Sequence, residues 1–155
     1  MSDISHTKNE RHTTRVAVFV LLIKEGKTFL LRRQNTGWAD GMLTVPSGHV
    51  DAGETVPQAA IKEVREEAGV LVDERNLEFM HVQYVQDVYI NFFFKTEQWE
   101  GEPHVAEPEL ASECSWAPLD ALPDDLIYHI KAMLLQSTQG NYFSGVRNDP
   151  NPTHQ

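Results

Sequence analysis

Residues 48–70 place the strongest constraint on how this chain can fold. The stretch begins as a glycine-containing loop and continues as a helical pattern. Thr55 is a favourable N-cap, and Gln58 stands three residues later, as a capping box requires. Gly69 is a natural helix stop. An apolar stripe recurs every four residues, formed by Val56, Ala60, Val64 and Ala68. We therefore predict a loop that leads directly into one amphipathic helix.

Three carboxylates share one face of this predicted helix. Glu63, Glu66 and Glu67 stand at positions i, i+3 and i+4. Two such charges ~5.5 Å apart repel by about 0.8 kcal/mol in water and about 3 kcal/mol at an effective dielectric near 20. The spacing fits either a solvated acidic face softened by Lys62 and Arg65, or a cluster that binds a divalent cation. The adjoining glycine loop favours the cation.

With the loop included, the stretch resembles the Nudix box, G-x5-E-x7-R-E-U-x-E-E-x-G-U, in which U is a bulky aliphatic residue. The family's arginine is replaced by Lys62. The other fixed positions match at the right spacing: Gly48, Glu54, Glu63, Val64, Glu66, Glu67, Gly69 and Val70.

The resemblance implies a metal-dependent enzyme that hydrolyses a pyrophosphate linkage. The substrate would be a nucleoside triphosphate or another nucleoside diphosphate-linked compound, cleaved to a nucleoside monophosphate plus pyrophosphate or a phosphorylated leaving group. The expected cofactor is Mg²⁺, with Mn²⁺ as a substitute. Its expected ligands are Glu67 first, then Glu63 and Glu66, with the carbonyl of Ser47 completing the site. Glu54 is interpreted as a structural acceptor that fixes the loop.

Lys62 is the one departure within the box. The family's arginine offers a planar fork that can hold a carboxylate through two hydrogen bonds, whereas lysine is a point charge on a flexible stem. We count Lys62 among the catalytic residues and expect reduced rather than absent activity.

The flanking segments are similar to the MutT branch of the family. They are residues 29–33, Pro46 and residues 99–103. On that similarity Glu107 is expected to be a metal-binding or general-base glutamate outside the box, with a solvated loop acid as the alternative. Arg32 is expected to contact substrate; the alternative is that it is a strand residue whose side chain faces solvent. Trp38 could stack on a base, although loop tryptophans more often anchor their loop.

Composition narrows the class of partner. The chain carries a formal net charge of −10, which disfavours a nucleic-acid polymer as partner. A small anionic nucleotide remains acceptable if a metal or local cations bridge the charge. Cys114 is the only cysteine, so no intrachain disulfide can form and a reducing, cytoplasmic location is expected. We expect no membrane segment or signal peptide, and either a monomer or a homodimer.

The chain length of 155 residues suits one domain. Strands are predicted at residues 16–23, 28–33, 42–45, 77–85, 88–95 and 113–119, and a second helix starting at 123–125 with Asp124 and Asp125 as caps. The resemblance implies an α/β fold, the Nudix α/β/α sandwich, with a mixed sheet between two main helices. Residues 14–140 would form this domain, residues 1–13 a flexible segment, and residues 141–155 a tail that is mobile or packs late.

Two other functions compete with the enzyme. One is a Nudix-like module that binds or senses a nucleotide with little or no hydrolysis, which only Lys62 favours. The other is an acidic interaction domain, which leaves the glycine loop unexplained. The retention of Glu63, Glu66 and Glu67 argues against a pure binder, because three repelling carboxylates have little purpose there.

Overall fold

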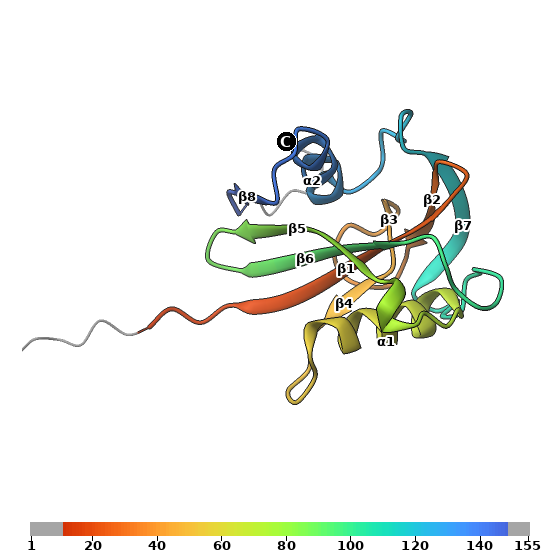
Figure 1. The fold of residues 1–155 in the computed structure, drawn as a ribbon, viewed down its shortest axis with the longest axis horizontal. Helices are drawn as coiled ribbons and strands as arrows, with labels where there is room; N and C mark the ends of the chain where they lie inside the picture. Colours follow the sequence, from red (N-terminus) through yellow and green to blue (C-terminus); the bar gives the residue numbers. More distant parts are fainter. Residues whose placement is uncertain (1–10, 149–155) are drawn as a thin grey trace, which may run out of the picture.

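The computed structural model describes residues 11–148, which form one mixed sheet with a main helix on each face (Figure 1). The helices are α1 (Val56–Ala68) and α2 (Tyr128–Thr138), with a short 3₁₀ turn η1 (Glu74–Asn76). The strands are β1 (Arg15–Lys24), β2 (Lys27–Arg33), β3 (Leu43–Thr44), β4 (Ser47–His49), β5 (Glu78–Val85), β6 (Tyr89–Thr96), β7 (Ala111–Pro118) and β8 (Phe143–Val146).

The sheet is organised around β1. Its strands follow the order β3-β2-β1-β6-β5-β8, while β4 also pairs with β1 and β7 with β2. Strands β1 and β6 run parallel along their length, and β5 and β8 are parallel too. The remaining pairs are antiparallel. On the edge of β1 opposite β6, residues 17–19 pair with β4, and residues 23–24 pair with β2.

The unbroken apolar run of β1 serves two cores. Val18, Val20 and Leu22 pack into the cluster that includes α1, and Leu21 and Ile23 pack into the cluster that includes α2. This division follows from the two-residue period of a strand, which sends successive side chains to opposite faces. The predicted sandwich, a mixed sheet between two main helices, is confirmed.

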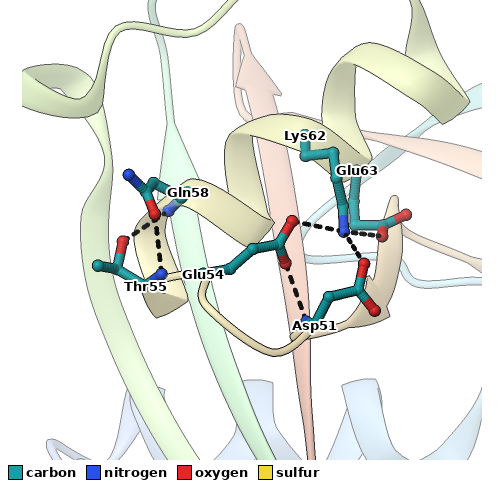
Figure 2. Close-up of polar contacts among 6 residues, drawn as sticks. All are labelled: Asp51, Glu54, Thr55, Gln58, Lys62 and Glu63. Atoms are coloured by element: carbon teal, nitrogen blue, oxygen red, sulfur yellow. Dashed lines mark hydrogen bonds and ion pairs between the residues drawn. The ribbon is translucent and has the colours of Figure 1, made fainter.

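Helix α1 has the predicted boundaries. The Thr55 side chain accepts from the Gln58 backbone N–H at 3.2 Å, and the Gln58 side chain accepts from the Thr55 backbone N–H at 2.9 Å (Figure 2). Gly69 ends the helix in the left-handed conformation at φ 69°, which an L side chain rarely adopts. The helix thus carries its own start and stop signals.

The second helix begins later than predicted, and the interpretation of Asp124 and Asp125 as its caps is wrong. The N-cap of α2 is Ile127, and no side chain caps it. Asp124 and Asp125 instead form a turn, in which Leu126 N–H donates to Pro123 O at 3.2 Å. The segment then bonds to β3: Leu43 N–H donates to Asp125 O at 2.9 Å, and Ile127 N–H donates to Leu43 O at 3.0 Å. The chain can turn into a helix only after these bonds.

Two further segments differ from the prediction. The start of the predicted glycine loop is a strand, β4, because Gly48 pairs with Val18 of β1. The tail, predicted to be mobile or to pack late, includes a strand that was not predicted, since β8 pairs in parallel with β5. The buried His81 fixes it through Asn141 O at 2.9 Å and Ser144 Oγ at 2.8 Å. The rest of the predicted termini, residues 1–10 and 149–155, lies outside the described residues. Within residues 11–148, neither helix is long and apolar enough to cross a membrane.

Candidate active site

A cavity of about 800 Å³ brings most of the predicted site residues together. One part of its wall is acidic and comprises Glu63, Glu66, Glu67, Glu107 and Asp51, together with Ser47 and Gly48 of β4. Another part is aromatic and amide-bearing, with Phe19, Trp38, Tyr89, Asn91 and His129 among its residues. One cavity is therefore lined by carboxylates together with aromatic side chains and an amide.

Glu67 is held by the strand that precedes its helix. Its Oε2 accepts a hydrogen bond from the backbone N–H of Ser47 at 3.0 Å. In the ladder with β1, Pro46 O accepts from Val20 and Val16 O accepts from Val50, so Ser47 is a position whose N–H and C=O both point away from β1. The Ser47 carbonyl consequently lies on the same side of β4 as Glu67, as the metal-ligand prediction requires.

Glu63 lies directly over Gly48. A Cβ atom at position 48 would overlap the carboxylate of Glu63, so only glycine leaves room for this side chain against β4. The side chain of Glu63 is 13% exposed. The glycine at the start of the box therefore has a packing role that spacing alone does not reveal.

Glu107 reaches the helix carboxylates because its loop docks on the end of α1. His104 N–H donates to Ala68 O and Ala106 N–H donates to Glu67 O, both at 3.1 Å. These bonds satisfy carbonyls that the last helical turn leaves open. The loop thus brings a fourth carboxylate, far from the box in sequence, to the same cavity.

Three carboxylates of this cavity, Glu63, Glu67 and Glu107, hold protons more tightly than free glutamate. Burial, with repulsion from Glu66, raises the pKa of Glu63 to about 7. Burial raises the pKa of Glu67 to about 8, against the lowering effect of the Ser47 N–H. Burial and Glu66 also raise the pKa of Glu107. Each of these shifts is mainly the cost of taking a carboxylate out of water, with a smaller contribution from neighbouring negative charge.

These shifts predict how the stability of the metal-free protein depends on pH. The native state keeps protons on Glu67 and Glu63 at pH values where the unfolded chain has lost them, so unfolding becomes easier as pH rises from about 5 to about 8. Between pH 6 and pH 8 we expect a loss of about 2–4 kcal/mol, because each extra native proton is worth about 1.4 kcal/mol per pH unit, and Glu67 keeps its proton over most of this range while Glu63 loses it within the range. Urea titrations in EDTA would measure it, and Glu67→Gln should flatten the slope. Stability that rises over this range would contradict the assignment.

Lys62 lies at the centre of a second group of charges (Figure 2). Its Nζ lies 2.8 Å from Asp51 Oδ2, 2.8 Å from Glu54 Oε1 and 3.7 Å from Glu63 Oε1. Asp51 and Glu54 raise the pKa of Lys62, so it stays charged. Glu54 also accepts from the Asp51 backbone N–H at 2.9 Å. Lys62 therefore holds the glycine turn to α1 through one contact to Asp51 and one to Glu54, rather than through a planar guanidinium. Glu54 fixes the loop, as expected.

Two substitutions separate charge from geometry at position 62. Lys62→Met should lower the free energy of unfolding by about 1–2 kcal/mol, because it leaves three carboxylates facing one another in a partly exposed place. Lys62→Arg should hold or raise turnover, since a fork can bond Glu54 and Asp51 together. Lys95→Met is the matched control, because Lys95 has one long contact, to Glu78 at 3.9 Å. A sharp fall in turnover for Lys62→Arg would contradict this interpretation of the site.

Arg32 does not line the cavity. Its guanidinium bonds Asp125 at 2.7 Å and Gly41 O at 2.8 Å and also pairs with Glu113. Its neighbour Arg33 lines the cavity instead. Successive strand residues point to opposite faces, and Arg33 shares the side of Leu31, another cavity residue. Substrate contact by Arg32 stays a prediction, and Arg33 is the arginine of this strand that lines the cavity.

Trp38 does line the cavity, and its loop is held firmly. The Arg33 guanidinium lies 5.4 Å from the Trp38 ring centroid and donates to the Trp38 carbonyl at 2.9 Å. The indole also lies near the His129 ring, with ring centroids 6.1 Å apart and planes 23° apart. Burial lowers the pKa of His129, so this imidazole is neutral at pH 7. His129 and Asn91 carried no motif in the sequence and were missed.

The donor set fits a hard divalent cation, although it is not preset for one. Within residues 11–148, no three histidine, cysteine, aspartate or glutamate side chains are already gathered as ligands of a single ion. The carboxylates are glutamates on a shared wall, whose side chains can rotate. Burial raises the pKa values of Glu63, Glu67 and Glu107, with smaller contributions from neighbouring negative charge, and oxygen ligands of this kind suit Mg²⁺. Glu63, Glu66, Glu67 and Glu107, with the Ser47 carbonyl, are the residues that could hold it.

Comparison with known proteins gives a consistent result. The NUDIX domain family model matches residues 13–136. The chain is 30% identical to the oxidized purine nucleoside triphosphate hydrolase of Danio rerio, covering 75% of this chain and 78% of that protein. It is 31% identical to the 8-oxo-dGTP diphosphatase of Escherichia coli, covering 68% of this chain and 83% of that protein.

Two further matches bear on breadth of function and on fold. The chain is 30% identical to the NAD-capped RNA hydrolase NudC of Shigella flexneri over 77% of this chain, but it spans only 45% of that protein. The crystal structure of a MutT NUDIX hydrolase from Burkholderia pseudomallei superimposes with a TM-score of 0.72 at 25% sequence identity, covering 80% of this chain and 98% of that one.

Proposed function

The chain belongs to the Nudix family, as a MutT-like hydrolase of phosphorus anhydrides, and on that basis we propose that it hydrolyses the pyrophosphate linkage of a nucleoside triphosphate with Mg²⁺. The products would be a nucleoside monophosphate and pyrophosphate. The single observation that carries this proposal is the convergence of Glu63, Glu66, Glu67 and Glu107 on one cavity that also has an aromatic wall. A nucleotide is a ligand with both a polyanionic and a planar aromatic part.

Each group in the cavity has a definable task. The helix carboxylates and the Ser47 carbonyl would hold the cation, which when bound supplies positive charge to the phosphate oxygens and lowers the pKa of water. Glu107, which lies outside the helix, has a raised pKa, and a raised pKa makes a carboxylate a stronger proton acceptor. Arg33 adds a cation to the cavity wall. The aromatic wall at Trp38 suits stacking on a base.

A small nucleotide is the substrate that this surface favours. The net charge of −10 opposes the backbone of a long nucleic acid. The similarity to a NAD-capped RNA hydrolase keeps nucleoside diphosphate compounds, including dinucleotides, in the test panel. The sensor alternative has one observation in its favour, the lysine at position 62, but Lys62 lies in the charge cluster beneath the loop and is absent from the cavity wall.

The test is a nucleotide panel with controlled metal. Purified protein is stripped with EDTA, then assayed for released phosphate and pyrophosphate with purine and pyrimidine triphosphates and dinucleotides. We expect no turnover without metal, full turnover with Mg²⁺, and partial replacement by Mn²⁺. Tight nucleotide binding without turnover across the whole panel would favour the sensor, and turnover in excess EDTA would contradict the metal-dependent mechanism.

A further inference from the structure

Among the residues that line the cavity is a buried amide that the proposed chemistry does not use. Asn91 lies on β6, in the face of the sheet that α2 covers, and is 3% exposed while lining the cavity. It stands directly opposite Gln83 of β5, which is fully buried. Buried amides need hydrogen-bond partners, so the question is where those of Asn91 lie.

The two amides form a relay that begins at a backbone carbonyl. Gln83 Nε2 donates to His129 O at 3.0 Å, and Asn91 Nδ2 donates to Gln83 Oε1 at 3.3 Å. A backbone carbonyl can only accept, so the Gln83 amide cannot turn round, and its Oε1 must face Asn91. The orientation of the Asn91 amide, which is otherwise ambiguous, is thereby fixed.

This arrangement leaves hydrogen-bonding capacity directed at the cavity. One N–H of Asn91 is used on Gln83, while Oδ1 and the second N–H have no bond within residues 11–148. Within residues 11–148, the buried side-chain N and O atoms that have neither solvent access nor a hydrogen-bond partner are the hydroxyl oxygens of Thr14 and Thr28. Asn91 Oδ1 is not among them. Asn91 Oδ1 is therefore reached from the cavity, and the amide presents an acceptor beside a donor.

His129 connects this pair of amides to the aromatic wall of the cavity. His129 supplies the carbonyl that starts the relay, and its ring lies against Trp38. A planar group resting on that wall would meet a fixed donor–acceptor pair in the same cavity. Asparagine paired in this way recognises base edges, since a base offers an N–H next to an acceptor atom.

We propose that Asn91 reads the hydrogen-bonding edge of the substrate's nucleobase, with Gln83 as the positioning residue that fixes its direction. The inference rests on the proposed function, because it assumes that a nucleotide enters this cavity. In this proposal Asn91 determines which base is accepted, whereas the carboxylates act on the phosphates.

The test compares ratios rather than rates. kcat/KM is measured for triphosphates of the four common bases and of 8-oxoguanine with the wild-type protein, Asn91→Leu and Asn91→Ala. Leucine matches asparagine in size, and alanine leaves room for water if leucine prevents folding. We expect the spread of kcat/KM between best and worst base to shrink about tenfold to a hundredfold, mainly through KM. The concentration of Mg²⁺ for half-maximal turnover should not change.

Two further variants complete the design. Gln83→Met should also reduce the spread between bases while Asn91 remains, which a purely structural role of Gln83 would not produce. Asn141→Leu is the control, because that exposed amide bonds Gln136 outside the cavity. Unchanged ratios in folded Asn91 variants would overturn the inference alone. Absence of turnover of every nucleotide by the wild-type protein would overturn the proposed function and the inference with it.

Discussion

Glu67→Gln should lower kcat by about 10² to 10³, the loss typical of removing one preorganised charged or polar group from a catalytic centre. Glu67 is the carboxylate that β4 holds in place, through the Ser47 N–H at 3.0 Å. Glutamine keeps the size and an acceptor oxygen for that bond but loses the negative charge. The measurement is steady-state hydrolysis at saturating Mg²⁺.

The same variant should not be less stable than the wild type. The wild-type carboxylate has its pKa raised to about 8 by burial, so a neutral side chain suits the metal-free site above that pH. We expect Glu67→Gln to unfold at an equal or higher urea concentration than the wild type at pH 8.5 in EDTA. Glu74→Gln is a matched control, because Glu74 is exposed in η1. Wild-type turnover in Glu67→Gln would remove Glu67 from the mechanism.

Gly48→Ala should disable the site with little effect on the fold. The new Cβ would occupy the space of the Glu63 carboxylate. The obstacle is the end of a flexible side chain, so Glu63 can rotate away, and its departure removes a predicted metal ligand. We expect a tenfold to hundredfold fall in kcat/KM, about the cost of disturbing the orientation of a metal ligand, and a higher Mg²⁺ requirement.

Gly145→Ala provides the matched control for this substitution. Gly145 is also a strand glycine, in β8, and a Cβ there would meet nothing closer than Tyr84 O at 4.0 Å. Both variants should unfold within about 1 kcal/mol of the wild type, the ordinary scale of a glycine-to-alanine change at a compatible position. If Gly48→Ala retained full activity, or if Gly145→Ala lost as much, the account of Glu63 over Gly48 would be wrong.

Local signals made the central helix predictable from sequence. Thr55 and Gln58 bond each other across one turn, and Gly69 needs only its own backbone freedom. The carboxylates of α1 share a face because helical geometry requires it. These features depend on neighbours within a few residues, so a sequence pattern can specify them.

The remainder depends on contacts between distant segments. Strand β8 forms because His81, sixty residues away in sequence from Asn141, bonds the C-terminal segment. The start of α2 is delayed by bonds to Leu43. Asn91 stands inside an aromatic strand, and its role appears only beside Gln83 and His129. No local pattern contains these pairings.

The choice between Arg32 and Arg33 shows a different limit. Adjacent strand residues face opposite sides, so either arginine could have lined the cavity. The register shift between Leu31 and Arg33 in the pairing of β2 with β7 changes the local geometry at this point. Which side faced the cavity depended on where β4 and α1 would lie, and only the fold decides that.

The central claim is that the carboxylates of α1 and Glu107 form a metal-dependent centre that splits a nucleotide pyrophosphate. Its most direct test is ³¹P NMR of a nucleoside triphosphate incubated with the protein while Mg²⁺ is added stepwise. The account predicts no reaction in EDTA, then nucleoside monophosphate and pyrophosphate signals that grow with Mg²⁺ and nearly vanish in Glu67→Gln. Products that form without metal, or nucleoside diphosphate and orthophosphate in their place, would contradict it.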